Sequence, residues 1–192
     1  DMANKDKIAK LLRFSSTADA AKEQRVSLED YVSRMQEGQD VIWYVTAENR
    51  KSAENSPHLE IFRKKGVEVL LMSERIDEWV MGYFNEFDGK QLRSIAKGDV
   101  DLGSAEDKKQ DEEDKKDSEQ DPILARLSEA LTDNVKEVRA SQRLTESASC
   151  LVLSEQELAM HMRRMLEQAG QELPDSKPVL EVNLEHSLLK QV

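Results

Sequence analysis

Two short apolar segments on either side of a helical stretch constrain the fold of this chain most. Residues 41–46 (VIWYVT) and 67–72 (VEVLLM) are almost entirely β-branched, aromatic or aliphatic, which is typical of strands buried on both faces. Residues 49–65 between them read as a helix with a break or a fresh start at Pro57 and an end at Gly66. A strand, a helix of about 15 residues and a strand form a βαβ unit. We therefore expect the two strands to be parallel, with a right-handed crossover.

Further elements are expected around this unit. Residues 5–13 have helical spacing, residues 15–26 read as a loop, and residues 92–96 suggest a third strand. Ser27 and Asp30 form a capping-box pattern ahead of a short helix that ends at Gly38. Residues 74–87 predict one helix with a single apolar face, formed by Ile76, Trp79, Val80, Tyr83, Phe84 and Phe87.

A highly charged stretch interrupts the chain after this part. Residues 106–121 (EDKKQDEEDKKDSEQD) contain four basic and nine acidic side chains and no apolar one. Their net charge of −5 is nearly half of the chain's total of −11. A segment without apolar side chains cannot join a core, so we expect an acidic linker at 104–121, a hinge between folded units rather than an interaction tail. Whether it is helical or disordered stays open.

The remaining residues predict a second, smaller unit. A helix is expected at 122–131, capped by Asp121, and strands at 135–139, 148–153 and 178–183. A capping box that starts at Ser154 and a stop at Gly170 predict a helix at 155–169. The expected fold class is α/β, α+β overall: a small α/β/α unit with a βαβ parallel core at 1–103, then a small α+β domain at 122–192.

Composition excludes several classes of protein. No apolar run approaches the roughly 18 residues that a membrane span needs, and we expect no secretory leader. A single cysteine suits a reducing compartment, so we expect a cytoplasmic protein. A pI near 4.9 argues against nonspecific nucleic-acid binding. Because residue 1 is Asp, we expect a processed chain or a piece of a longer one.

Residue types with catalytic or metal-binding chemistry are sparse. His58, His161 and His186 are far apart and lack partners at ligand spacing, so we expect no metal site. Cys150 lies in a predicted strand, which favours a buried, inert thiol. No phosphate-binding loop and no nucleophile elbow occurs, so we expect no catalytic residue. An enzyme with an unrecognised site is an alternative that ATP turnover would support.

Two features suit a binding protein. Trp79, beside Glu78, is large enough to anchor a partner if part of its ring is exposed. The helix at 155–169 carries a flexible, Met-rich stripe of the kind that accepts varied partners, formed by Leu158, Met162, Met165, Leu166 and Ala169 and widened by Met160. From pattern alone, burial in the core is the more common use of both.

Four stretches together resemble one family. Residues 27–47 (SLEDYVSRMQEGQDVIWYVTA) and 57–79 (PHLEIFRKKGVEVLLMSERIDEW) are similar to consecutive stretches of the ninety-kilodalton heat-shock chaperone family. Residues 87–91 (FDGKQ) and 138–144 (VRASQRL) also fit. The resemblance is strongest to bacterial members and covers nearly the whole chain.

The resemblance implies a layout. Residues 1–103 would be the last part of the family's middle domain, and residues 122–192 the first part of its C-terminal domain. The domain that binds ATP and Mg²⁺ would lie upstream, and the helices of the family's homodimer would lie past Val192. This chain would then contain no cofactor, hydrolyse no ATP and dimerise weakly.

The resemblance also implies a function. Members of the family bind unfolded or partly folded client proteins, and Trp79 and Glu78 match a client-contacting motif (DEW). Leu158, Met165 and Leu166 occupy the position of a second client-contacting helix. We therefore expect a fragment of a cytoplasmic molecular chaperone that captures non-native chains on weak apolar surface, without nucleic-acid or membrane partners. The alternative is a structural connector that transmits motion between the ATPase and dimerisation domains and contacts no client.

Overall fold

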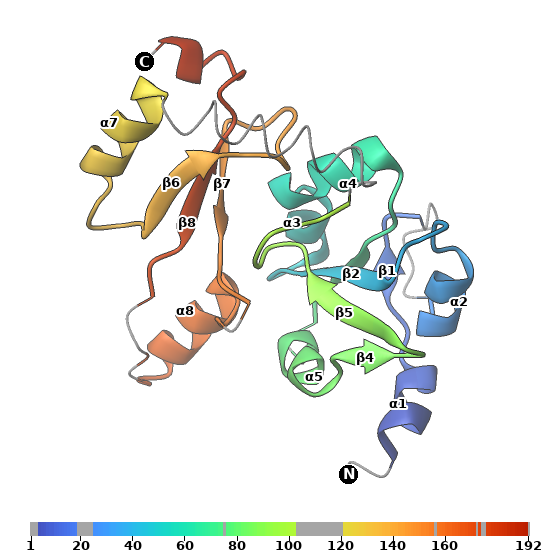
Figure 1. Cartoon of the computed structure of the whole chain (residues 1–192). Coiled ribbons are helices and arrows are strands. Elements are labelled where there is room, and N and C mark those ends of the chain that lie inside the picture. Colours follow the sequence, from blue (N-terminus) through green and yellow to red (C-terminus); the bar gives the residue numbers. More distant parts are fainter. Residues whose placement is uncertain are drawn as a thin grey trace.

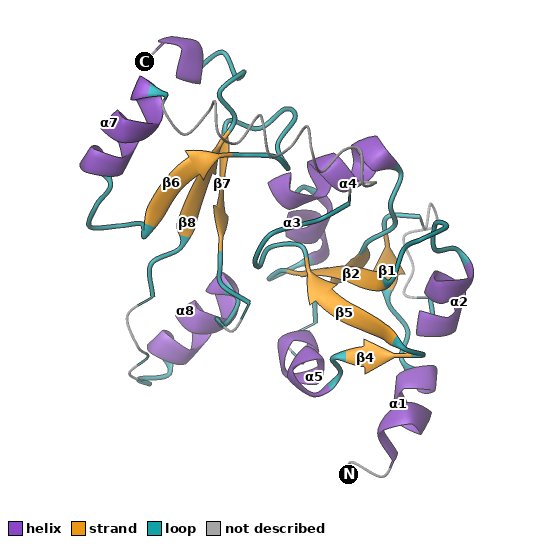
Figure 2. Cartoon of the chain, viewed as in Figure 1, coloured by secondary structure: helices purple, strands orange, loops and turns teal. Residues whose placement is uncertain are grey.

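The computed structural model of the chain describes residues 4–18, 25–74, 76–102, 121–155, 157–171, 173 and 176–191. Its strands form two mixed sheets, one of five strands and one of three (Figure 1). Helices pack around both sheets, so the fold is α+β, as the sequence predicts (Figure 2). The elements up to residue 94 are α1 (Lys5–Leu11), β1 (Ser15–Ser16), α2 (Leu28–Ser33), β2 (Val41–Thr46), α3 (Arg50–Glu54), η2 (Pro57–Leu59), α4 (Glu60–Lys65), β3 (Leu70–Met72), α5 (Asp77–Tyr83), β4 (Glu86–Phe87) and β5 (Lys90–Ser94). Those from residue 122 are α7 (Pro122–Ala130), β6 (Glu137–Ala140), β7 (Ser149–Val152), α8 (Met160–Gln168), β8 (Val179–Val182) and η3 (Leu189–Gln191).

The βαβ unit predicted from the two apolar segments is present. β2 and β3 pair in parallel, with Tyr44 opposite Leu70. The chain between them forms three short helical pieces, because Pro57 begins a new 3-10 turn. Gly66 ends the last piece in the left-handed conformation, at a φ of 66°. The third expected strand is β5, which pairs with β2 in parallel.

The core of the five-stranded sheet explains why β2 is apolar on both faces. β2 is the middle strand in the order β1-β3-β2-β5-β4. Ile42 and Tyr44 enter a core shared with α1, α2 and α5, whereas Trp43 and Val45 enter a core shared with α3 and α4. Trp43 packs edge-on against Phe62 of α4, with ring centroids 5.3 Å apart. The predicted α/β/α arrangement is thus confirmed.

The capping box ahead of α2 is confirmed. The Asp30 N–H donates to the Ser27 hydroxyl and the Ser27 N–H donates to the Asp30 carboxylate, each at 3.0 Å. The helix ends at Ser33, earlier than the predicted end at Gly38. Gly38 lies in the turn that follows, with a φ of 81°.

The loop predicted at 15–26 is wrong at its start, because β1 pairs antiparallel with β3. β1 is an edge strand of two serines, so it shows no apolar pattern from which a strand could be predicted. Thr17 continues the pairing, since it exchanges hydrogen bonds of 3.0 Å with the backbone of Val69. Residues 19–24 of the predicted loop lie outside the described residues.

The single helix predicted at 74–87 is also wrong. α5 spans only Asp77–Tyr83, and Phe87 belongs to β4, which pairs antiparallel with β5. The Asp77 carboxylate accepts a hydrogen bond of 2.8 Å from the Glu74 N–H, which keeps the preceding residues in a turn. At the other end the chain must reverse through Asp88 to form the β4–β5 pair, which a continuing helix would prevent.

The three-stranded sheet combines a parallel pair, β6 and β8, with an antiparallel pair, β7 and β8. α7 packs on this sheet through Leu124. The predicted cap is confirmed, because the Asp121 carboxylate accepts a hydrogen bond of 2.8 Å from the Ile123 N–H. Apart from Asp121, the linker expected at 104–121 lies outside the described residues.

Candidate binding surface

Helix α5 carries large apolar side chains on its solvent side. Ile76, at the N-cap position, is exposed, as are Trp79 and Tyr83, with exposed fractions of 53% and 71%. Their spacing of three and four residues puts them on one face of the helix. Met81 and Phe84, on the other side, are buried in the core of the five-stranded sheet. Helix α5 is therefore apolar on two sides, and the fold buries only one of them.

The exposure of Trp79 separates a binding role from a core role. The sequence pattern alone favours burial of this residue, as it does for most tryptophans on apolar stripes. A row of exposed aromatic and aliphatic side chains is instead typical of a surface that meets a partner. Trp79 is thus available for contact, together with Ile76 and Tyr83.

The helix predicted after Ser154 begins late. The Ser154 N–H donates to the Glu157 carboxylate at 2.6 Å, which is one half of the predicted capping box. The described residues up to Ala159 are nevertheless not helical, and α8 spans Met160–Gln168. The Ala159 N–H bonds to the carboxylate of Glu78 on α5, at 3.3 Å. A contact with a distant part of the chain thus takes the place of the local helix start.

The predicted apolar stripe of α8 is divided between core and surface. Met162 is only 1% exposed, so it belongs to the core and is unavailable to a partner. Met165 is 38% exposed and Leu166 is half-buried. Leu158 is exposed, but it precedes the helix. The side chain of Met160 lies outside the described residues.

Glu78 is the one predicted contact residue whose side chain is buried, with 8% of it exposed. One carboxylate oxygen accepts from the Thr46 hydroxyl at 2.8 Å, and the other from Lys97 Nζ at 3.0 Å and from the Ala159 N–H. Burial alone would raise the pKa of Glu78, but the Lys97 ammonium and these hydrogen bonds outweigh it and hold the pKa below its usual value. The Glu78 carboxylate is thus engaged within the fold, and contact of this residue with a client stays a prediction.

The segment that leads into α8 lies against the residues that follow β5. Leu153 forms two backbone hydrogen bonds with them: its N–H donates to the Ala96 carbonyl at 3.1 Å, and its carbonyl accepts from the Gly98 N–H at 2.8 Å. The carboxylate of Glu155 forms an ion pair with Arg93. These contacts bring α8 to the same side of the molecule as α5, the lower part of Figure 1.

A buried ion pair beside the three-stranded sheet lies where the two sheets meet. Arg143 and Glu181 each have only 4% of the side chain exposed, and their charged groups are 2.8 Å apart. The Arg143 guanidinium also donates to the carbonyl oxygens of Ile95, at 2.7 Å, and Gly98, at 2.8 Å. Arg139 shares the Glu181 carboxylate at 2.8 Å. One arginine thus links the three-stranded sheet to the turn after β5.

A carboxylate from the part of the chain with the five-stranded sheet also binds the loop before β7, in the part with the three-stranded sheet. Glu60, the first residue of α4, accepts hydrogen bonds from the N–H groups of Thr145 at 2.6 Å, Glu146 at 2.7 Å and Ser147 at 3.1 Å. Burial alone would raise the pKa of Glu60, but the combined effect of these hydrogen bonds is larger, so the net pKa lies below its usual value. Both ends of β7 are therefore held against the first part of the chain.

Other candidate sites carry less chemistry. Cys150 is buried, as predicted, and burial raises the pKa of its thiol to about 12. Among the residues that the structure describes, no three His, Cys, Asp or Glu side chains are grouped so as to hold a metal ion. Over the same residues, no helix is long and apolar enough to cross a membrane.

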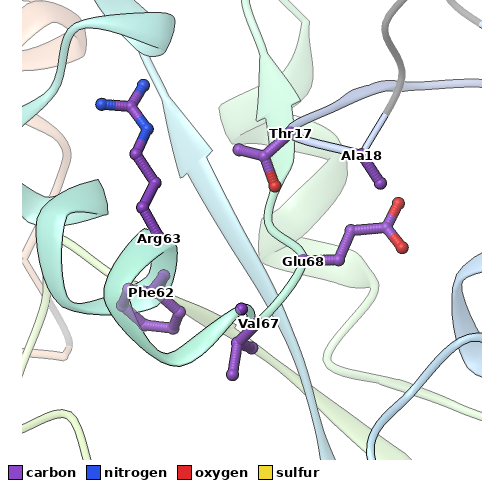
Figure 3. Close-up of a pocket in the computed structure, with 7 residues that line it drawn as sticks. Thr17, Ala18, Phe62, Arg63, Val67 and Glu68 are labelled. Atoms are coloured by element: carbon purple, nitrogen blue, oxygen red, sulfur yellow. The ribbon is translucent and has the colours of Figure 1, made fainter.

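A cavity of about 280 Å³ lies between α4 and the end of β1 (Figure 3). Its lining includes Phe62, Arg63 and Glu68. The Glu68 carboxylate is already engaged by Ser16 at 2.6 Å and by Arg34 at 2.8 Å. This acidic group is therefore committed to the fold, and we assign the cavity no role.

A family model described as Hsp90 protein matches residues 1–192. The chain belongs to the Hsp90 family. It is 53% identical over 192 residues to the chaperone protein HtpG of Legionella pneumophila (strain Lens), and 54% identical over 193 residues to that of Chromobacterium violaceum. The HtpG of Bordetella pertussis is 53% identical over 196 residues. These alignments include all of this chain but only 30%, 31% and 30% of the three relatives, so the chain spans about 30% of their length.

Sequence reasoning did not assign Ile76 and Tyr83 to the surface of this Hsp90 chain. Both share the helix face of Trp79, so their spacing of three and four residues was the available signal. That signal was ambiguous, since Val80 and Phe84 follow the same spacing one residue later. Only the packing of α5 on its sheet decides which of the two stripes faces solvent.

Proposed function

We propose that this chain is the part of a molecular chaperone that captures non-native polypeptides. The capturing surface consists of Ile76, Trp79 and Tyr83 on α5, together with Leu158 and Met165 at α8; we call it the α5–α8 surface. The observation that carries the proposal is the 53% exposure of Trp79 on a helix whose other side is buried. Membership of the Hsp90 family supports a chaperone role.

The chemistry of the α5–α8 surface suits weak and unselective binding. A non-native chain exposes scattered apolar groups, and a chaperone must bind them without a fixed sequence and then release them. Tryptophan supplies contact area, and methionine adapts its shape. Ion pairs flank Met165, formed by Arg163 with Glu167 at 3.0 Å and by Arg164 with Glu48 at 4.0 Å. Charged side chains around an apolar patch keep it hydrated while no client is bound.

The family relationship supports further parts of the proposal. We expect residues 1–103 to form the end of the middle domain, 104–121 the linker and 122–192 the start of the C-terminal domain. ATP and Mg²⁺ binding, ATP hydrolysis and strong dimerisation would then depend on parts of the relatives that this chain does not span. We expect the parent protein to act in the cytoplasm as a homodimer.

The first test replaces Trp79. Trp79→Ser is expected to weaken binding of a reduced and alkylated, permanently unfolded protein about tenfold, because an aromatic anchor often dominates an apolar contact. The free energy of unfolding should change by about 0.5 kcal/mol or less, as for other surface substitutions. Titration calorimetry and urea unfolding measure the two quantities.

The matched control for Trp79 is Leu11→Ser, since Leu11 is an exposed aliphatic residue on α1, outside the α5–α8 surface. This variant should bind the unfolded protein as the unaltered chain does. Equal affinity of Trp79→Ser and the unaltered chain would refute the proposed function. A large loss of stability in Trp79→Ser would show instead that Trp79 serves the core.

The polar contacts between the two sheets favour a second function, a connector that transmits motion. Buried Arg143 and the Glu60 carboxylate would pass a rotation of one part directly to the other. In a pure connector, an unfolded client would leave the accessibility of Trp79 unchanged. Trp43 is only 3% exposed, so Trp79 should provide nearly all the fluorescence that acrylamide quenches. Strong quenching that an unfolded client suppresses would favour capture over the connector.

A further inference from the structure

The side chain next to Trp79, that of Glu78, projects from a different side of α5. Successive residues of a helix project about 100° apart, so Trp79 reaches solvent while Glu78 is turned toward the sheet. The Glu78 carboxylate meets groups from three separate places: the Thr46 hydroxyl at the end of β2, the Lys97 ammonium after β5 and the Ala159 N–H before α8. One buried carboxylate thus lies at the junction of the two halves of the α5–α8 surface.

We propose that Glu78 is a positioning residue, whose carboxylate holds the start of α8 against α5 and so fixes the spacing between Trp79 and Met165. The proposal rests on the proposed function, because it concerns the same surface. It replaces direct contact with a client as the role of Glu78.

The start of α8 depends on this carboxylate. Ala159 is the N-cap residue of α8, and its side chain makes no capping hydrogen bond. The first N–H groups of a helix need acceptors, and a negative charge at that end is favourable. Glu78 supplies both from another element of the chain, and the partner Lys97, with 14% of its side chain exposed, keeps the carboxylate charged.

Two other ion pairs reach this region, and both are more open to water. Arg164 and Glu48 are 4.0 Å apart, with 67% and 62% of their side chains exposed. Glu155, which pairs with Arg93, has 61% of its side chain exposed. Exposed pairs contribute little, because water and salt screen them. We therefore expect the buried Glu78 contact to determine where α8 lies.

Fixed spacing matters for clients long enough to meet both helices. A client held by α5 presents its next apolar group to α8 at a high effective concentration, provided that the spacing is constant. Loss of Glu78 should weaken such two-point binding. It should leave a short peptide, which touches α5 alone, almost unaffected.

The experiment compares Glu78→Ala and Glu78→Gln with the matched control Glu48→Ala, another carboxylate that pairs with a cation near α8. Spin labels at Glu86→Cys, on β4 just after α5, and at Gln168→Cys, at the end of α8, report the distance between these two positions by double electron–electron resonance, in a Cys150→Ser background. Affinity is measured for the unfolded protein and for a five-residue peptide with one central tryptophan.

Glu78→Ala should broaden the distance distribution and weaken binding of the unfolded protein about tenfold, with less than a twofold change for the peptide. Glu78→Gln keeps an acceptor for Ala159 but loses the charge, so its effect should be intermediate. Glu48→Ala should match the unaltered chain. If Glu78→Ala unfolds the chain, Glu78→Gln and Lys97→Met provide the same comparison.

Two results would overturn the positioning role: an unchanged distance distribution in Glu78→Ala, or equal weakening of both ligands, which indicates direct contact. Trp79→Ser separates this failure from failure of the proposed function. If Trp79→Ser weakens binding and the Glu78 variants do not, only the positioning role is wrong. If Trp79→Ser has no effect, the proposed function itself fails.

Discussion

Replacing Arg143 with Met is expected to lower the free energy of unfolding by about 3–5 kcal/mol, the usual cost of removing one member of a buried ion pair. The substitution would leave the Glu181 carboxylate, only 4% exposed, with Arg139 as its remaining cation. It would also remove the donors to the carbonyl oxygens of Ile95 and Gly98. Urea unfolding followed by circular dichroism measures the loss.

Arg139→Met is the matched control for this prediction. Arg139 contacts the same Glu181 carboxylate, but 31% of its side chain is exposed, and its second partner, Asp99, is 70% exposed. Water screens such a pair, so the expected loss is about 1 kcal/mol or less. Equal losses for the two variants would contradict the central place of Arg143 in the contact between the sheets.

The stability of the chain should fall as the pH is lowered from about 6.5 to about 4, because of His58. Burial and, to a lesser extent, the nearby Arg143 guanidinium lower the pKa of His58 from 6.5 to about 4, a net value that includes the opposing effect of Glu181 and Glu60. The unfolded chain therefore gains a proton in this range that the folded chain does not. The difference amounts to about 3 kcal/mol over the whole range.

His58→Gln should remove this part of the pH dependence, because glutamine keeps a donor and does not titrate. Glu60 and Glu78 also lose stabilisation on acidification, but their pKa values lie below the usual 4.5. Their effect belongs to the acid end, so the two chains are compared between pH 5 and 6.5. If the stability of His58→Gln falls as steeply as that of the unaltered chain, the buried neutral imidazole is ruled out as the cause.

Local patterns predicted the three inner strands of the five-stranded sheet, β3, β2 and β5, but neither edge strand. The apolar runs at β2 and β3 could only be strands covered on both faces, and Ser27, Gly66 and Asp121 mark helix ends by the chemistry of their own side chains or backbone. These features depend on neighbours in sequence, so a single sequence contains them.

Features set by distant contacts could not be predicted. α8 begins only at Met160, and its N-cap residue Ala159 bonds to a carboxylate 81 positions earlier in the chain. Helix α5 has two apolar stripes, and periodicity cannot tell which of them the sheet covers. Glu78 looks like a surface acid in the sequence, and only Thr46, Lys97 and Ala159 together reveal it as buried.

The most direct test of the account follows the α5–α8 surface by NMR while an unfolded protein is added. The indole N–H of Trp79 and the methyl group of Met165 should shift together with a single dissociation constant. The signals of the Trp43 indole and the Met72 methyl group, both buried in the core, should keep their chemical shifts. Binding that leaves the Trp79 and Met165 signals unchanged would contradict the proposal that this surface captures non-native chains.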